Sequence, residues 1–422
     1  MPRTYRNIFV SALALASVAA QAANDPSPTF WNRPNLFGDV GGLRPALQTH
    51  GIDFSPVYTG EIFGEVSGSQ GGNRFIYDHN LNLPLTVDLE KAAGWRGALL
   101  HANVFWLTGR SLSQDSVHDL ANVSNIAAYP TVRLQELWLQ QNFWNQRASV
   151  KIGALAVDND FFTATSSALF INSSFGTFAL IAANLPSPPI YPVAAPAVRF
   201  SVQPDPHFYF QAGIFDGDSG AQDQNKNGVQ FHFSDGDGAL IFSEIGFNFH
   251  PDADEKTLAG SVKLGSFVHT KHVPTWASRL AGDEGGTMNY GFYAVAEHEL
   301  FKCGAKKITA FARGGLAPAE RNVIGHFFDV GFNFTGFLPG RANDVAGIAF
   351  ARPSFTSGFS KYQQSVNGSA AFDSENVLEL TYRAQLTPWW TLQPDFQLIL
   401  TPGGESKSEN AVVLGLRTSL LF

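Results

Sequence analysis

The chain has 422 residues, with 28 Lys and Arg against 36 Asp and Glu, and its net charge of -8 argues against nucleic acid as a partner. Its single cysteine, Cys303, excludes an intrachain disulfide, so stability must come from a core or from a closed hydrogen-bonded sheet. The 37 Phe, 40 Gly and 23 Pro residues favour strands and turns over helices.

The first 22 residues have the pattern of a secretory signal peptide. Two arginines make a basic start, residues 8–20 form an apolar centre, and a small-residue cleavage site ends at Ala22. The apolar centre is too short to anchor a mature protein as a helix. We therefore expect export, followed by an N-terminal segment over residues 23–50 that contains one short helix beginning near Leu43.

From residue 51 to residue 422 the sequence alternates between apolar and polar residues with a period of two, which predicts β-strands. In the first segment, for example, Ile52 and Phe54 share one face and Asp53 and Ser55 share the other. We expect about sixteen strands on this pattern. Their predicted ranges are 52–66, 75–89, 98–108, 134–143, 149–156, 197–203, 207–215, 239–249, 260–269, 288–300, 306–314, 327–335, 345–350, 376–387, 391–400 and 411–422.

A large sandwich or a propeller would also alternate in this way, and it would bury the apolar face in a core. Three features favour a transmembrane antiparallel β-barrel over residues 51–422. The segments are near the ~9 to 11 residues that a tilted membrane strand needs, and short turns alternate with long loops. Aromatic residues also stand at strand ends, such as Trp95, Tyr290, Trp389 and Trp390.

The last predicted strand ends in an aromatic residue, Phe422, with Leu414 and Leu416 on one face and Gly415 and Arg417 on the other. This ending resembles the C-terminal signal by which bacterial outer-membrane barrels are recognised and inserted. We expect the strand to pair with the first one. Such closure leaves no open edge in lipid, where an unpaired amide is costly.

Residues 161–198 contain no Asp, Glu, Lys, Arg or His. Gly176 and several prolines interrupt the segment, so it cannot form a membrane-spanning helix of about 20 residues. We expect a long structured loop that folds into the lumen and narrows it. In that position Asn172, Ser173 and Asn184 would offer hydrogen bonds.

If the apolar face of each strand meets lipid, the opposite face lines the lumen, and it carries charges of both signs. Mixed charges and many amides suit uncharged polyhydroxy solutes, because hydroxyl groups need both donors and acceptors. The alternative for any one of these residues is a solvated or salt-bridged wall position. The candidate constriction and solute-binding residues are Glu61, Arg133, Glu136, Trp138, Arg199, Glu244, Arg383 and Arg417.

The loop at 216–228 matches the first half of a calcium-binding loop through Asp223, Asn225 and Asn227. The twelfth position, where a bidentate Glu is wanted, is Ser234, so we expect a plain surface loop and no metal site. No cluster has zinc-ligand spacing. The sequence also lacks a G-x-S-x-G motif, and we expect neither an enzyme nor a cofactor.

Three long motifs carry a family resemblance: GDVGGLRPALQTHGIDFSPVYTGE, VSNIAAYPTVRLQELWLQQNF, and the block from KIGALAVDNDFF to AVRFSVQP. Together with FQAGIFDGD and FSDGDGALIFSEIGF, they are similar to the carbohydrate-selective porins of Gram-negative outer membranes, the OprB type. The similarity covers essentially the whole chain after the signal peptide. One departure is Val40, because members often have Trp at that position, and this puts the packing of the N-terminal segment in doubt.

The resemblance implies a sixteen-stranded barrel that admits glucose-like sugars by facilitated diffusion, with a pore narrowed by inserted loops and by charged wall residues. It assigns the wall role to Glu61, Arg133, Glu136 and Arg199. It places the barrel in the outer membrane and the segment over residues 23–50 in the periplasm. The expected partners are small neutral carbohydrates, outer-membrane lipid and lipopolysaccharide, and both a monomer and a homotrimer stay open.

Two alternatives remain beside the sugar-selective channel. One is a general diffusion porin without sugar preference, and the other is a structural barrel closed by its loops.

Overall fold

The computed structural model describes residues 29–422 except 69–73, 222–223, 232–233, 235 and 254–256, and the predicted signal peptide lies outside the described residues. The helices are α1 (Leu43–Thr49), α2 (Leu89–Ala93), α3 (Ala179–Ala182), α4 (Trp276–Ala281) and α5 (Ser357–Asn367). The strands are β1 (Ile52–Phe54), β2 (Val57–Ser67), β3 (Phe75–Asp88), β4 (Ala98–Gly109), β5 (Thr131–Phe143), β6 (Ala148–Leu155), β7 (Ala195–Val202), β8 (Phe208–Asp216), β9 (Ala239–Phe249), β10 (Gly260–Pro274), β11 (Gly286–Cys303), β12 (Lys306–Leu316), β13 (Ile324–Thr335), β14 (Val345–Phe355), β15 (Asn376–Thr387), β16 (Trp390–Leu400) and β17 (Ala411–Leu421).

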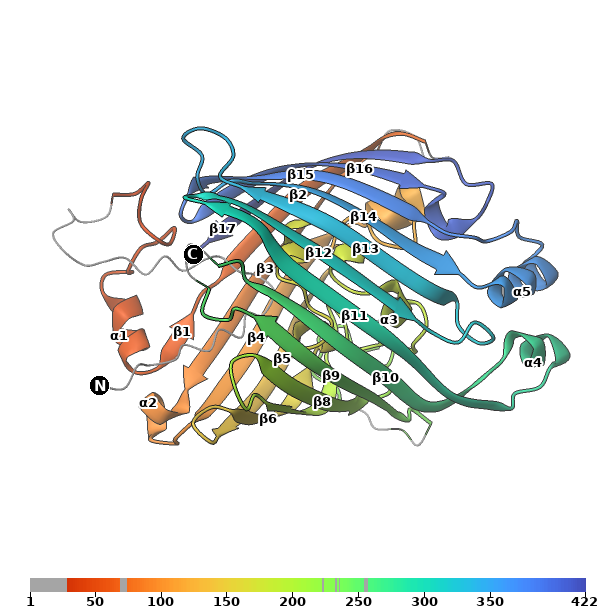
Figure 1. Ribbon diagram of the computed structural model, residues 1–422, viewed down its shortest axis with the longest axis horizontal. Coiled ribbons are helices and arrows are strands. Elements are labelled where there is room, and N and C mark those ends of the chain that lie inside the picture. The colour runs from red at the N-terminus through yellow and green to blue at the C-terminus, as the bar shows by residue number, and fades with distance from the viewer. Residues whose placement is uncertain (1–28, 69–73, 222–223, 232–233, 235, 254–256) are drawn as a thin grey trace.

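The strands form a closed antiparallel barrel. Each strand from β2 to β16 pairs with the next one along the chain, and β17 pairs with β2, with Arg417 opposite Glu61. The short strand β1 precedes β2 and pairs with β3. The sheet therefore has no open edge, and the predicted barrel of about sixteen strands is confirmed (Figure 1).

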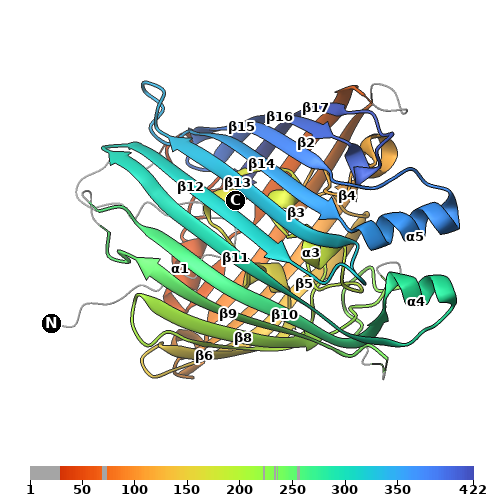
Figure 2. The same cartoon turned by 45° about the vertical axis from the view of Figure 1, so that its right-hand side comes forward.

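The two ends of the barrel differ. Short connections, the helix α1 and residue Phe422 lie at one end, which we call the short-turn end. The longer loops with α4 and α5 project from the opposite, long-loop end (Figure 2). The predicted short N-terminal helix is confirmed as α1.

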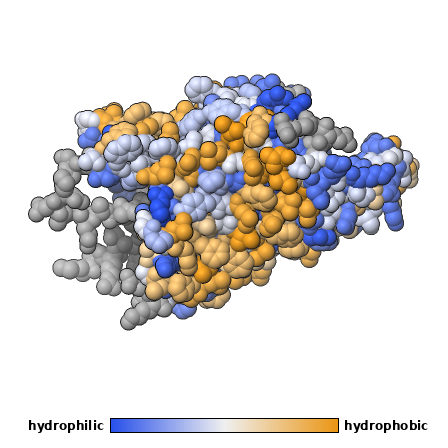
Figure 3. All heavy atoms as spheres, turned by 90° about the horizontal axis from the view of Figure 1, so that it is seen from above, coloured by the Kyte–Doolittle hydropathy of each residue, from blue (hydrophilic) through white to orange (hydrophobic). Residues whose placement is uncertain are grey.

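Side chains alternate between the outer and inner faces of the wall as period-two patterning requires. On β2, Ile62 is 50% exposed on the outer face, whereas its neighbour Glu61 is 1% exposed on the inner face. Apolar residues gather over the middle of the outer surface in Figure 3, and hydrophilic residues gather where α4 and α5 project. The outer face thus has the polarity of a lipid-contacting surface.

The interior is filled at mid-height by residues 156–194, between β6 and β7, which confirms the expected inserted loop (Figure 1). Its phenylalanines are fully buried, and they stack on one another and on the wall. The rings of Phe162 and Phe178 lie 5.0 Å apart, and Phe178 lies 5.2 Å from Phe327 on β13. Aromatic pairs of this kind stabilise the packing beyond the area that they bury.

In the part of the chain that the structure describes, no helix is long and apolar enough to cross a membrane.

Candidate functional site

The inner wall from β9 to β15 binds the backbone of the loop at 156–194. Glutamates on three strands accept hydrogen bonds from loop N–H groups: Glu244 from Phe162 (2.9 Å), Glu297 from Ser166 (2.8 Å), and Glu379 from Ile171 (2.6 Å) and Asn172 (2.9 Å). The loop has little regular secondary structure, so these N–H groups would otherwise be buried without partners. A carboxylate is a strong acceptor for backbone N–H groups.

Basic and amide side chains of this wall and of the adjoining strand β16 complete the attachment by donating to loop carbonyls. Lys263 donates to Thr163 (2.7 Å), Arg313 to Ser174 (3.0 Å), Asn333 to Ser166 (2.8 Å) and Gln393 to Leu169 (2.8 Å). Arg313 is also paired with Asp329 on β13, and both side chains are fully buried. The polar groups in this part of the wall are therefore occupied by the loop.

A second loop, residues 110–130 between β4 and β5, also enters the barrel and packs on the first. Glu375, just before β15, accepts the N–H groups of Leu120 (2.7 Å) and Ala121 (3.0 Å). Burial raises the pKa of Glu375 to about 7, although the N–H groups that it accepts act in the opposite direction. The sequence interpretation missed this insertion, although residues 120–132 are free of charged side chains just as residues 161–198 are.

Two of the three loop residues expected to offer hydrogen bonds, Asn172 and Asn184, use their side-chain amides within the protein. Asn172 is fully buried, and its amide donates to Ala121 O (3.2 Å) and to Gln397 Oε1 (3.0 Å). Asn184 exchanges two hydrogen bonds with the backbone of Ile324 (2.8 and 2.9 Å). The N–H of Ser173 donates to Asn122 O (2.9 Å) in the second loop.

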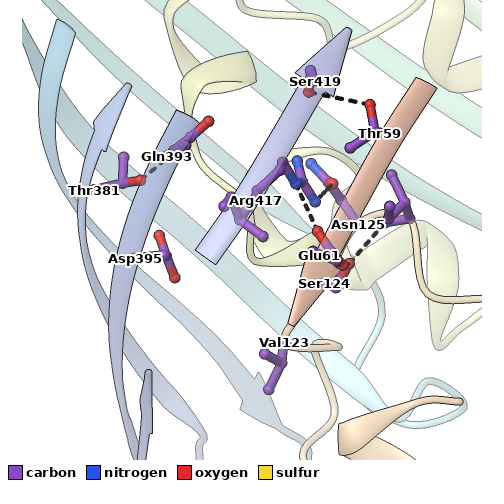
Figure 4. A network of polar contacts seen from close by, with 12 residues as sticks. Thr59, Glu61, Val123, Ser124, Asn125, Thr381, Gln393, Asp395, Arg417 and Ser419 are labelled. Carbon is purple, nitrogen blue, oxygen red and sulfur yellow. Dashed lines mark hydrogen bonds and ion pairs between the residues drawn. The ribbon is translucent and has the colours of Figure 1, made fainter. Parts of the chain in front are cut away.

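Three of the predicted wall charges, Glu61, Arg133 and Arg417, lie around Tyr191 of the first loop, together with Asp78 on β3. Figure 4 shows Arg417 turned toward Glu61, with a distance of 2.6 Å between Nε and Oε2. Burial raises the pKa of Tyr191 well above its ordinary value, and the negative charges of Glu61 and Asp78 raise it further. This Tyr191 cluster therefore places both signs of charge around one phenol.

The second loop closes the other side of the Tyr191 cluster. Ser124 donates to Glu61, and Asn125 accepts a hydrogen bond from Arg417 (2.8 Å), as Figure 4 shows. Tyr191 donates its hydroxyl to the carbonyl oxygen of Ile126 (2.9 Å). The Tyr191 cluster is thus built from β17, β2, β3, β5 and both inserted loops.

A separate basic group lies nearer the short-turn end, where the first loop leaves β6. Asp160 of the loop pairs with Lys151 (2.8 Å) and Arg199 (3.5 Å), and Lys151 lies 4.7 Å from the ring centroid of Trp138. Burial alone would raise the pKa of Asp160, but the two cations outweigh it and lower the pKa. Glu136 accepts the N–H of Ala156 (2.8 Å), the first residue of the loop.

The last two predicted residues lie apart from both groups. Glu244 is fully buried under the loop, where it also accepts hydrogen bonds from Gln211 (2.9 Å) and Tyr209 (2.8 Å). Arg383 is half-buried on the inner face of β15, toward the short-turn end. The predicted set is therefore divided between the Tyr191 cluster, the basic group and the loop attachment, with Arg383 in none of the three.

Buried polar atoms without a protein partner concentrate on three neighbouring strands, β3, β4 and β5. They are Asp78 Oδ2, Asn80 Oδ1 and Asn82 Oδ1 on β3, Asn103 Oδ1 on β4, and Arg133 Nε and Trp138 Nε1 on β5. Other such atoms, for example Asn333 Oδ1 and Asp395 Oδ2, lie singly on other strands. Because buried polar groups are normally hydrogen-bonded, this row of acceptors and donors is suited to hydroxyl groups that are not part of the protein.

Within the described residues no group of three or more His, Cys, Asp or Glu side chains is arranged to hold a metal. Of the weak calcium candidates, Asp223 lies outside the described residues. The side chain of Asn225 bonds to Gln230, and that of Asn227 donates to Val132 O (2.9 Å). These two amides are therefore used in loop structure.

Comparison with known proteins gives one consistent result. Residues 72–422 match the family described as carbohydrate-selective porin, OprB family. The chain is 27% identical to Porin B of Pseudomonas aeruginosa over 456 residues, which is 100% of this chain and 98% of that protein. It also resembles the high-pH structure of Pseudomonas putida OprB, with a TM-score of 0.85 at 24% identity over 93% of this chain and 100% of that one.

A more distant fold similarity is the outer-membrane channel DcaP of Acinetobacter baumannii, with a TM-score of 0.53 at 10% identity, over 88% of this chain and 97% of that one.

The loop attachment leads to a testable prediction at Glu379. Replacing Glu379 by Ala leaves two buried N–H groups without an acceptor, which costs about 1–3 kcal/mol for each. We expect the loop to loosen, so that single-channel current in planar bilayers becomes larger and noisier and protease cuts within residues 156–194. The matched control is Glu299→Ala, because Glu299 accepts the N–H of Ala259 and does not contact this loop. Equal currents and cleavage in the two variants would contradict the assignment.

Proposed function

Since the chain belongs to the OprB family of carbohydrate-selective porins, we propose that small neutral sugars cross its barrel along the inner faces of β3, β4 and β5. A member of this family is a channel and not an enzyme. The chain is accordingly a sugar-selective channel of the Gram-negative outer membrane. The route, the constriction residues and the preference for glucose-like sugars are our proposal.

The observation that carries the route is the row of unpartnered polar atoms on β3, β4 and β5. The wall from β9 to β15 gives its carboxylates and cations to the inserted loop, so they are not free to bind a solute. The row runs from Arg133, near the long-loop end of β5, to Trp138, nearer the short-turn end. Water satisfies such atoms in an empty channel, and sugar hydroxyls can replace that water.

The constriction in this proposal is the Tyr191 cluster. Glu61, Arg133 and Arg417 present an acceptor and two donors within one ring, and a sugar hydroxyl can use either kind of group. The adjacent charges of opposite sign also reduce the net field, which disfavours concentration of one kind of ion. We expect the cluster to favour neutral polyhydroxy solutes over charged ones.

The remaining predicted residues receive different roles. We assign Trp138, Arg199 and Glu136 to shaping the path below the constriction, where the loop leaves the wall. We assign Glu244 to holding the loop, as its bond to Phe162 supports. Arg383 would meet the solute last, near the short-turn end.

Conductance in planar bilayers separates the three functions considered for the barrel. We expect a steady conductance that millimolar glucose reduces, because a bound sugar displaces water and ions from the constriction. Conductance that is indifferent to glucose would favour a general diffusion porin. No conductance at all would favour a barrel closed by its loops.

If Arg133 is part of the constriction, Arg133→Gln should weaken the reduction of the current by glucose. Loss of one charged donor costs about 1.5 kcal/mol, so the glucose concentration that halves the current should rise roughly tenfold. Arg352→Gln is the control, because Arg352 bonds to Asn376 (2.9 Å) on the outer face near the long-loop end. An unchanged glucose block in Arg133→Gln would exclude Arg133 from the path.

Contact with lipopolysaccharide at the long-loop end and assembly as a homotrimer are also proposals. The trimer is supported by a hydrogen-bonded group on the outer faces of β2, β3 and β4, where Tyr58 bonds to Tyr77 and His79 lies 3.4 Å from the hydroxyls of Tyr77 and Thr108. Polar groups on this face are costly in lipid and would be shielded by a neighbouring copy. Analytical ultracentrifugation in mild detergent should give the mass of three chains, and the mass of one chain would contradict the trimer.

A further inference from the structure

An apolar groove of about 410 Å³ lies between the N-terminal segment and the barrel at the short-turn end. One side is formed by residues of α1 and of the turn before it, and the other by the outer face of β3 and by the last residue of the barrel. The principal lining residues are Val40, Leu43, Leu47, Leu81, Leu83 and Phe422. Arg44 and Gln48 are the polar residues that reach its edge.

The groove is held open by hydrogen bonds between backbone segments that are far apart in sequence. The N–H of Leu36 donates to Leu421 O (2.8 Å), and the N–H of Phe422 donates to Pro56 O (2.9 Å). Arg44 of α1 donates through separate nitrogens to Phe422 O (2.8 Å), Gly38 O (3.1 Å) and Phe54 O (3.3 Å). Because both walls are tied together in this way, the segment cannot simply collapse onto the barrel to fill the space.

The groove opens on the side of the barrel that meets lipid. Leu81 and Leu83 alternate with Asn80 and Asn82, whose side chains lie on the inner face, so the two leucines face outward. The groove is therefore continuous with the apolar outer surface. At the short-turn end of an outer-membrane barrel, that surface meets the inner leaflet, which faces the periplasm.

The N-terminal segment also exposes large apolar side chains beside the groove. Phe37 is 60% exposed and Leu43 is 55% exposed. Exposed apolar patches of this kind mark binding surfaces, and this one borders a groove that is continuous with the apolar outer surface. An apolar cavity of about 150 Å³ binds one benzene molecule, so this groove has room for a large part of an acyl chain.

We propose that the groove is a specific site for one acyl chain of an inner-leaflet phospholipid, which fills the space between α1 and β3. The chain lies against Leu43 and Leu47 on one side and against Leu81 and Leu83 on the other. Arg44 lines the groove and uses three of its five N–H donors on carbonyl groups, which leaves two that a phosphate can accept. The bound lipid joins the N-terminal segment to the barrel.

Native mass spectrometry of the full chain, purified from outer membranes in mild detergent, tests the site. We expect a species that is heavier by one phospholipid. In Leu47→Asp a charge enters the groove, and the lipid-bound fraction should fall at least tenfold. Val366→Asp is the control, because Val366 is an exposed aliphatic residue on α5 at the opposite end, and it should keep the lipid.

A second variant distinguishes loss of the lipid site from a folding defect in Leu47→Asp. Val40→Trp fills the groove without adding charge, because Val40 lines it. This variant should lose the lipid to the same degree. It should still migrate on a gel as a folded barrel whose mobility changes on heating, and glucose should reduce its conductance as in the parent.

A phospholipid with a photoreactive group in its acyl chain provides the positional test. In the parent protein, labelling should concentrate on peptides from residues 36–56 and from β3, and Val40→Trp should abolish it there. Three results would overturn the proposal: labelling spread evenly over the barrel, retention of the lipid in both variants, or a bound mass that belongs to lipopolysaccharide or to a second copy of the chain.

Discussion

Every backbone N–H and C=O group that enters the barrel must find a partner, and this requirement organises the interior. The wall strands satisfy their own groups through the closed sheet. The loops at 110–130 and 156–194 cannot do so, because they have little regular structure and are buried. Side chains of the wall therefore supply the missing partners, and Glu379 alone accepts two successive N–H groups, those of Ile171 and Asn172. Many charged residues of the lumen therefore have a structural role, which is to bind the backbone of the inserted loops.

This use of the wall has a consequence for solute selection. A charge that is bound to the loop is neutralised or fully hydrogen-bonded, as in the buried pair of Arg313 and Asp329, so it contributes little to recognition. The sector of β3, β4 and β5 attaches the loop through Glu136, but it also carries amides and an indole with atoms that have no protein partner. In the proposed route, selectivity for uncharged sugars arises from the wall groups that the loops leave unbound. The Tyr191 cluster lies at the border between the two sectors, since Tyr191 belongs to the loop and Arg133 to the wall.

Hydrogen bonds to backbone groups also hold the N-terminal segment against the barrel. Its helix has no buried residues of its own, and it is held by hydrogen bonds from Arg44 and from the backbone of Leu36. The barrel seam beneath it is the pairing of β17 with β2, so the segment covers the place where the two ends of the sheet meet. The N-terminal segment is therefore attached at the end of the strand pair that closes the sheet, through Leu421 and Phe422.

The amino-acid sequence by itself determined the barrel, the number of strands, the short helix at Leu43 and the entry of an uncharged loop into the lumen, although the end of the uncharged run, residues 195–198, belongs to the wall strand β7. These features are carried by local patterns: period-two alternation repeats within each strand, and a long uncharged run is visible without knowledge of any contact. Parity also placed Glu61 and Arg417 on the inner face. Only the tertiary structure decided which inner-face charges surround Tyr191 and which hold the loop. Glu244 and Glu61 both occupy inner-face positions of alternating strands, so the sequence does not distinguish them. They differ in the loop residues that they contact in the folded barrel. The tertiary structure also decided the entry of residues 110–130 and the groove beside α1, since both depend on contacts between segments that are up to hundreds of residues apart in the chain.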